Sequence, residues 1–240
     1  MTRDPVDVLR RVREGDLVDH DGERIILDFA LPLEDDEIVA LEDDLGLPLP
    51  DELVGVLRET RAIDGIEPID FTGRTMDVEV GELSPSGHPF AADGFGNFWF
   101  LDLTPEDTET APVFYLCHDP PVVVYQSPTL GDFLFELFRI YEPPRASAVI
   151  DVHDNAAFEI WRANPGVMGH ESALARDDQL GAFAKRLDER FEFVDLRVPE
   201  VGAGFSWGRY GPRTEIVRDG YARLFAYEKR PGFFSRLRGR

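Results

Sequence analysis

The stretch "FAADGFGNFWFLDL" (residues 90–103) joins two apolar runs through a short segment that contains two glycines. A dinucleotide-binding loop would have a third glycine three residues after Gly96, but Trp99 occupies that position. Such a loop would also lead into a helix that holds the phosphate, whereas the aromatic run that follows favours a strand. Glycine and asparagine tolerate positive φ. The stretch therefore predicts two strands joined by a turn rather than a phosphate-binding loop.

Apolar periodicity around this stretch predicts an α+β fold. Helical spacing covers residues 4–14, 34–45 and 51–61, with Gly46 expected to end the second helix. The clearest helix follows the strands at 127–141, and Ser127 is its expected N-cap. Strands are predicted within 75–83, 88–103 (two), 111–119 and 122–126, with a turn between two shorter ones at 20–22. Because strands and helices do not alternate, we expect an antiparallel sheet.

The motif "EPPRAS" at residues 142–147 is the expected boundary between two parts of the chain. Beyond it we expect helices over 154–163, capped by Asp154, and over 177–190. Strands are expected within 191–198, 204–210, 214–217 and 221–228, with a hairpin turn at 218–220. The resulting division is 1–33 (a helix and short strands), 34–142 (the main domain), 143–228 (an α+β extension) and 229–240 (a basic, flexible tail).

Composition favours a soluble, cytoplasmic protein, and we expect it to be monomeric when free. The chain of 240 residues is 43% hydrophobic, yet it has no apolar run long enough to span a membrane and a charged N-terminus unlike a signal peptide. Its single cysteine, Cys117, excludes an internal disulfide and a cysteine-based zinc site. We therefore expect no membrane association, although the basic tail leaves contact with anionic lipid or nucleic acid as an alternative.

The negative charge is confined to one part of the chain. Residues 1–140 hold 32 acidic and 9 basic residues, whereas residues 141–240 hold 15 acidic and 16 basic ones. Adaptation to high salt would acidify both parts. A one-sided acidic field repels nucleic acid and attracts a basic partner, although a merely well-solvated surface is an equally good explanation at this stage.

The candidate catalytic groups lack a suitable arrangement in the sequence. Cys117, His118 and Asp119 are adjacent on a predicted strand, so their side chains point to alternate faces and do not form a hydrogen-bonded relay. The five histidines have no metal-ligand spacing. We expect no catalysis, no cofactor and no metal. An enzyme that uses His118, Asp119 or Asp102 in a cleft is the less favoured alternative.

Several short motifs, in their order along the chain, resemble the SUKH superfamily over roughly residues 34–138. This superfamily includes bacterial immunity proteins and a fungal cell-wall assembly regulator. The matching pieces are Glu42, Leu45-Gly46, Leu49-Pro50-Asp51, Asp64-Gly65, Gly96-Asn97-Phe98, Leu101-Asp102-Leu103, His118-Asp119 and the Ser127-to-Phe133 segment. The segment "IEPIDFTGRTMDVEVGELSPSGHP" (66–89) and everything after residue 142 depart from the family pattern.

The resemblance implies a SUKH-like antiparallel sheet flanked by two N-terminal helices and a closing helix, and a non-enzymatic protein-binding module. It suggests an immunity-type protein that neutralises a cognate bacterial toxin, such as a basic nuclease or deaminase domain. A regulatory scaffold or adaptor is the main alternative, and a DNA-mimic inhibitor is a minor one. The residues expected to meet the partner are Glu42, Asp43, Asp44, Asp51, Asp93, Asn97, Trp99, Asp102, His118 and Asp119.

Overall fold

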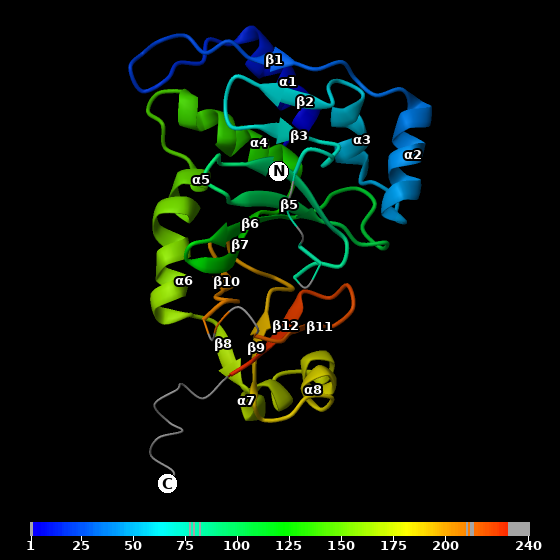
Figure 1. Ribbon diagram of the computed structural model, residues 1–240, viewed down its shortest axis with the longest axis vertical. Helices are drawn as coiled ribbons and strands as arrows, with labels where there is room; N and C mark the ends of the chain where they lie inside the picture. Colours follow the sequence, from blue (N-terminus) through cyan, green and yellow to red (C-terminus); the bar gives the residue numbers. More distant parts are fainter. Residues whose placement is uncertain are drawn as a thin grey trace.

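Two antiparallel sheets and the helices around them build the chain (Figure 1). The computed structural model describes residues 2–76, 78, 80–81, 83–209, 211 and 214–229. The larger sheet lies in the upper part of Figure 1 and the smaller one below it. The prediction of an α+β fold with antiparallel pairing is confirmed. Among the described residues, no helix is long and apolar enough to cross a membrane.

The eight-stranded sheet contains all strands of the first part of the chain and one strand of the extension. In spatial order it consists of β1 (Asp28–Phe29), β2 (Ala62–Asp64), β3 (Ile69–Asp70), β4 (Gly87–Ala92), β5 (Phe98–Asp102), β6 (Val113–His118), β7 (Pro121–Ser127) and β10 (Gly204–Phe205). The four-stranded sheet has the order β11 (Ile216–Arg218), β12 (Leu224–Glu228), β9 (Phe191–Asp195) and β8 (Val167–Gly169).

Three helices cover one face of the larger sheet. They are α1 (Pro5–Glu14), α3 (Asp51–Leu57) and α4 (Leu130–Phe138), and α2 (Asp35–Leu45) lies at the flank (Figure 1). The predicted stop of α2 is confirmed because Gly46 adopts a φ of 67°. The extension adds α5 (Ala148–Asp151), the π-helical turn η2 (Val152–Ala156), α6 (Ala157–Ala163), α7 (His170–Leu174) and α8 (Asp178–Ala184), and η1 (Arg139–Tyr141) follows α4.

The central strands are buried on both faces, which explains their uninterrupted apolar sequences. Because side chains alternate along a strand, Trp99 and Tyr115 point into the core beneath the helices, whereas Phe100 and Phe114 point to the other face. On that other face they pack with residues of the smaller sheet, such as Phe225. The extension therefore shares a hydrophobic core with the larger sheet and also supplies its last strand, β10.

Two predicted helix starts are wrong. Thr129, rather than Ser127, caps α4 by accepting a hydrogen bond from the Asp132 amide (3.1 Å), because Ser127 is still part of β7. In the extension, Ser147 caps α5, and Asp154 lies inside the π-helical turn that continues this helix. There the Asp154 carboxylate contacts His153 (2.9 Å) instead of capping a helix.

Other boundaries also differ from prediction. Helix α3 ends at Leu57 because the chain turns there toward β2, where the Thr60 hydroxyl bonds the carbonyls of Ala30 and Ala62. The predicted strand at 75–83 includes residues 77, 79 and 82, which lie outside the described residues, and its described positions are in no strand. The predicted hairpin between β11 and β12 is confirmed, but Arg218 is still part of β11 and the connection spans residues 219–223. Of the predicted flexible tail, only Lys229 is among the described residues.

Candidate functional site

Asp93 organises the turn between β4 and β5. Its Oδ1 accepts hydrogen bonds from the amides of Phe95 (2.8 Å) and Asn97 (3.1 Å). Gly94 and Gly96 have φ values of 76° and 90°, so the predicted turn with positive φ is confirmed. The turn is closed by its own hydrogen bonds, and 79% of the surface of Phe95 is exposed to solvent at its tip. A rigid turn with an exposed aromatic tip is well suited to contact another protein.

Asn97 joins this turn to the end of β6. Its Nδ2 donates to Asp93 Oδ2 (2.6 Å), while its Oδ1 accepts from the backbone amide of His118 (3.0 Å) and lies 2.8 Å from His118 Nδ1. Because the Asn97 oxygen is an acceptor, the contact places the His118 proton on Nδ1. The structure thus brings together three of the predicted residues, Asp93, Asn97 and His118, and Asp119 follows directly as an exposed residue.

A histidine of the extension completes this group. His153 Nε2 lies 3.5 Å from Asp93 Oδ2, and Tyr115 donates its hydroxyl to the same oxygen (3.4 Å). The hydrogen bond with Asp93 raises the pKa of His153 to about 9 despite partial burial. Burial by itself would raise the pKa of Asp93, but the bonds from His153, Asn97 and the turn amides lower it to about 2. At neutral pH the two side chains therefore form an ion pair.

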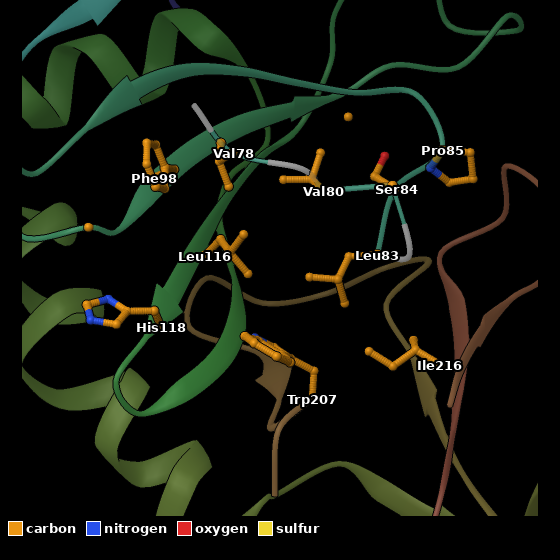
Figure 2. A pocket seen from close by; sticks show the side chains of 13 residues that line it. Val78, Val80, Leu83, Ser84, Pro85, Phe98, Leu116, His118, Trp207 and Ile216 are labelled. Carbon is orange, nitrogen blue, oxygen red and sulfur yellow. The ribbon is translucent and has the colours of Figure 1, made fainter. Parts of the chain in front are cut away.

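We call Asp93, Asn97, Tyr115, His118 and His153 the turn cluster. It borders a cavity of about 750 Å³ (Figure 2), because His118 of the cluster and the neighbouring turn residue Gly96 both line this cavity. Most of the other lining side chains are apolar, and Figure 2 shows them converging from both sheets and from the segment before β4: Val78, Val80, Leu83, Phe98, Leu116, Trp207 and Ile216. A hollow of this size and polarity can accept an apolar group from a partner.

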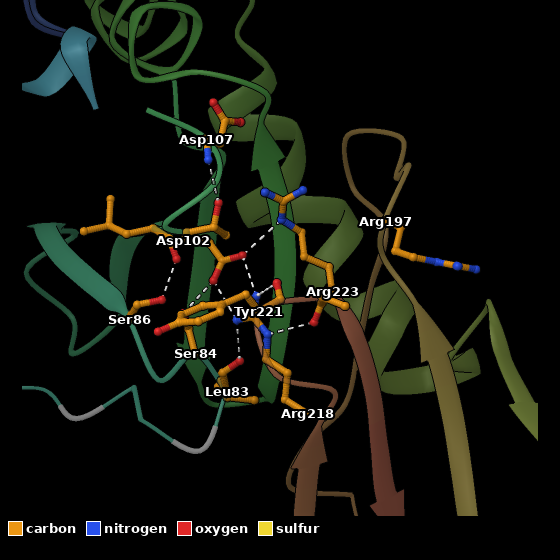
Figure 3. Close-up of polar contacts among 12 residues, drawn as sticks. Leu83, Ser84, Ser86, Asp102, Asp107, Arg197, Arg218, Tyr221 and Arg223 are labelled. Atoms are coloured by element: carbon orange, nitrogen blue, oxygen red, sulfur yellow. Dashed lines mark hydrogen bonds and ion pairs between the residues drawn. The ribbon is translucent and has the colours of Figure 1, made fainter. Parts of the chain in front are cut away.

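Two predicted partner-contact residues are internal. Trp99 is 3% exposed, and its indole N–H donates to Gln126 (3.2 Å). Asp102 is 1% exposed and binds Arg218 and Arg223 from the smaller sheet, as Figure 3 shows. Neither side chain reaches solvent, so we exclude both from the candidate surface. Asp102 is also bound in this separate cluster, away from His118.

The predicted acidic residues of the α2–α3 region are mostly exposed. Asp43, Asp44 and Asp51 are exposed. Glu42 has a structural contact, because its Oε1 accepts a hydrogen bond from the Leu49 amide (2.9 Å) and closes the loop between the two helices. Residues 34–44 hold seven acidic side chains and no basic one. We call the exposed carboxylates on α2 the acidic helix face.

Three residues with distinctive roles are not among the predicted site residues: Glu52, Phe95 and His153. Glu52 accepts hydrogen bonds from the amides of Ala111 (2.8 Å) and Leu130 (3.1 Å), and burial raises its pKa to about 7. Its position in an acidic, helix-opening sequence offers no hint of burial. Phe95 was visible as an aromatic residue between two turn glycines, a pattern that indicates exposure.

The sequence CHD at 117–119 does not form a nucleophile set in the structure. Cys117 is 4% exposed in the core under the helices, whereas His118 is exposed at the strand end. Burial raises the pKa of the Cys117 thiol, which is opposite to the shift that activates a nucleophilic cysteine. The predicted failure of adjacent strand residues to form a relay agrees with these positions.

Residues 32–136 match the SMI1 / KNR4 family (SUKH-1), and the predicted resemblance is confirmed over this segment. Proteins of this family are generally non-catalytic, and they include immunity and regulatory modules that bind partner proteins. No curated protein and no solved structure matches the chain. The family match stops before residue 137, so the extension lies outside it.

Proposed function

We propose that this protein is an immunity-type module that binds a cognate bacterial toxin and neutralises it by covering a basic surface. The observation that supports this most is the acidic helix face, which belongs to the segment that matches the SUKH-1 family. Nucleases and deaminases that act on nucleic acids have basic substrate-binding surfaces, because they bind phosphates. An acidic face that approaches such a surface increases the association rate and excludes the substrate.

We propose further that residues at and beside the turn cluster make direct contact with the toxin. Charged rims accelerate an encounter, but the stability of a complex comes from a few well-packed apolar or aromatic contacts. Phe95 offers an exposed aromatic ring beside a largely apolar cavity. We propose that exposed Asp43, Asp44 and Asp51 steer the toxin, and that Phe95, His118 and Asp119 contact it directly.

The adaptor alternative has less support. It assigns the recruitment of a further protein to the extension as a separate unit. However, the extension contributes β10 to the larger sheet and residues such as Phe225 to a common core. This arrangement favours an extension that stabilises the fold of the preceding segment rather than one that acts as a separate recruiting unit. A SUKH-1 chain of this kind acts, in our proposal, as one inhibitor rather than as two linked recruiting modules.

Co-expression with the toxin domain encoded beside this protein tests the proposal. The wild-type chain should restore growth of cells that produce the toxin. Asp43→Asn combined with Asp44→Asn should weaken the rescue, and so should Phe95→Ala. The matched control is Glu171→Gln with Asp178→Asn, which removes the same charge from exposed positions on α7 and α8 at the other end of the molecule (Figure 1). Failure of the wild-type chain to rescue growth or bind the toxin would refute the proposal.

A further inference from the structure

In the part of the chain that the structure describes, the two edges of the larger sheet differ in whether the outward-facing backbone groups have hydrogen-bond partners. At one edge, the outward-facing amide of Ser206, just after β10, donates to Asn164 Oδ1 (3.0 Å). Asn164 is the C-cap of α6, and its Nδ2 also donates to the hydroxyl of Tyr227. This edge is therefore closed by a side chain that belongs to the fold. Protected edges are the rule in soluble proteins, since an open edge can pair with another chain.

The opposite edge, β1, has no such closure among the described residues. The amide of Ala30 donates to the Ala62 carbonyl (3.0 Å) on β2, and Asp28 pairs with Asp64. Because hydrogen-bonding directions alternate along an antiparallel strand, the N–H and C=O groups of Phe29 point away from β2. β1 is the first strand in the sheet order, at the edge opposite β10, and Figure 1 shows it at the end of the molecule farthest from the smaller sheet.

Apolar side chains are exposed along this edge. Ile26 is 82% exposed and Leu31 is 78% exposed, on either side of β1. A hollow of about 350 Å³ lies beside the strand, and its lining includes Leu17, Ile25 and Phe29. An added strand would cover both aliphatic side chains and could place one of its own in this hollow. Unpaired backbone groups, exposed aliphatic residues and a hollow thus occur at one place.

The surrounding charge defines the chemistry of the segment that would fit. Residues 16–37 contain nine acidic residues and one basic residue, Arg24, which forms an ion pair with Asp16 (3.2 Å). Arg13 also lines the hollow, but its charge is paired with that of Glu59 (3.0 Å). Asp28, within β1 itself, is exposed. A strand that pairs here therefore needs basic residues facing these carboxylates and apolar residues at alternate positions. An acidic strand would be repelled.

We infer that the β1 edge is a docking site for an extended, basic segment of a partner protein, which adds to the sheet as a further strand. This surface lies before the SUKH-1 match at residue 32 and is distinct from the turn cluster. The inference rests on the proposed function only for the identity of the partner, which would be the neutralised toxin. The pairing chemistry itself is independent of that identity.

A synthetic peptide tests the edge without any toxin. The probe is a peptide of alternating lysine and valine, about nine residues long, with blocked ends. It should bind saturably to the full chain and slow the amide hydrogen exchange of Phe29, while a peptide of alternating glutamate and valine should not bind. Methylation of alternate backbone nitrogens should abolish binding when it removes the amides that face β1, and preserve binding in the other register.

Surface variants of the protein provide the matched control. Ile26→Ser with Leu31→Ser should weaken peptide binding about tenfold or more, because two exposed aliphatic groups no longer become buried. Val198→Ser removes a comparably exposed aliphatic group (95% exposed) outside the larger sheet and should leave the affinity unchanged. Equal losses in both variants, or binding without protection of Phe29, would overturn the inference.

A second experiment measures toxin binding by the wild-type chain and by the Ile26→Ser/Leu31→Ser variant. Its results distinguish the docking inference from the proposed function. If the toxin binds and the Ile26→Ser/Leu31→Ser variant binds it equally well, the β1 edge is not its docking site and the proposed function stands. If no toxin binds but the basic peptide pairs with β1, the proposed function fails and the edge inference survives for another basic protein. Loss of both peptide and toxin binding in the variant supports both proposals.

Discussion

Asp102, within the segment that matches the SUKH-1 family, forms a bidentate ion pair with Arg218 of the extension. Arg218 Nη1 lies 2.6 Å from Asp102 Oδ1, and its Nη2 donates to Oδ2 at 2.9 Å. The side chains are 3% and 1% exposed, and Arg223 and Ser84 also donate to the same carboxylate (Figure 3). The end of β5 is therefore linked to β11 by charged side chains. Burial of either charge without its partner would be costly in free energy.

The first prediction concerns this ion pair. Arg218→Ala should lower the free energy of unfolding by about 3 kcal/mol, because it leaves Asp102 buried with only part of its compensation. Arg58→Ala removes an exposed ion pair with Asp35 (2.9 Å) and should cost less than about 1 kcal/mol. Urea denaturation of both variants checks the difference. Equal costs would show that the buried pair contributes no more than a surface one.

The second prediction is that the segment matching the SUKH-1 family needs the extension in order to stay folded and soluble. A chain that ends at residue 142 would expose the apolar face of β5–β7, including Phe100, Phe114 and Tyr125. It would also lose β10, which covers the edge of β7. We expect this chain to aggregate or to bind a hydrophobic dye strongly, whereas residues 1–229 should stay monodisperse. A folded, soluble 1–142 fragment would contradict the shared core.

The third prediction uses the raised pKa of Glu52, which is about 7 in the folded protein against 4.5 for an ordinary glutamate. The folded state therefore binds this proton more tightly, and the contribution of Glu52 to stability falls as the pH rises from 4.5 to 7. The loss should be on the order of 1–3 kcal/mol. Glu52→Gln should remove this pH dependence, while Asp51→Asn, at an exposed position on the same helix, should retain it. Denaturation curves across this pH range measure both effects.

The fourth prediction concerns the ion pair of the turn cluster. Nuclear magnetic resonance titration should give His153 a pKa of about 9, because Asp93 stabilises its protonated form. Asp93→Asn should bring this pKa back toward 6.5. Since the pKa of His153 is higher in the folded state, its stabilising contribution is complete below pH 6.5 and is lost as the pH rises toward 9. An unchanged His153 pKa in Asp93→Asn would show that the contact is not electrostatic.

Local chemistry made much of the segment that matches the SUKH-1 family predictable from sequence. The turn glycines around Phe95, the stop at Gly46 and the long apolar stripe of α4 each depend on residues close together in the chain. The link between Asp93, Asn97 and His118 was only partly accessible. The family-like motifs contained Asn97 and His118, and Asp93 was among the residues expected to meet the partner, whereas their hydrogen bonds depend on the pairing of β5 with β6.

The features that escaped prediction depend on distant contacts. Asp102 and Trp99 resemble surface motif residues in sequence, but Arg218 and Gln126 bind them from elsewhere in the fold. The wrong cap assignment at Asp154 has the same origin, because the helix starts earlier, at Ser147, whose hydroxyl donates to the Glu136 carbonyl (2.6 Å). The uninterrupted apolar sequences of the central strands do indicate burial on both faces of the sheet, because strands that are buried on both faces lack the polar alternation of half-exposed ones.

The most direct test of the proposed function is the affinity of the purified chain for a purified candidate toxin domain from a neighbouring gene, measured by calorimetry at low and high salt. We expect one-to-one binding that weakens as the salt concentration increases, with a greater loss of affinity for Asp43→Asn/Asp44→Asn than for Glu171→Gln/Asp178→Asn. Absence of binding at either salt concentration would contradict the proposed function.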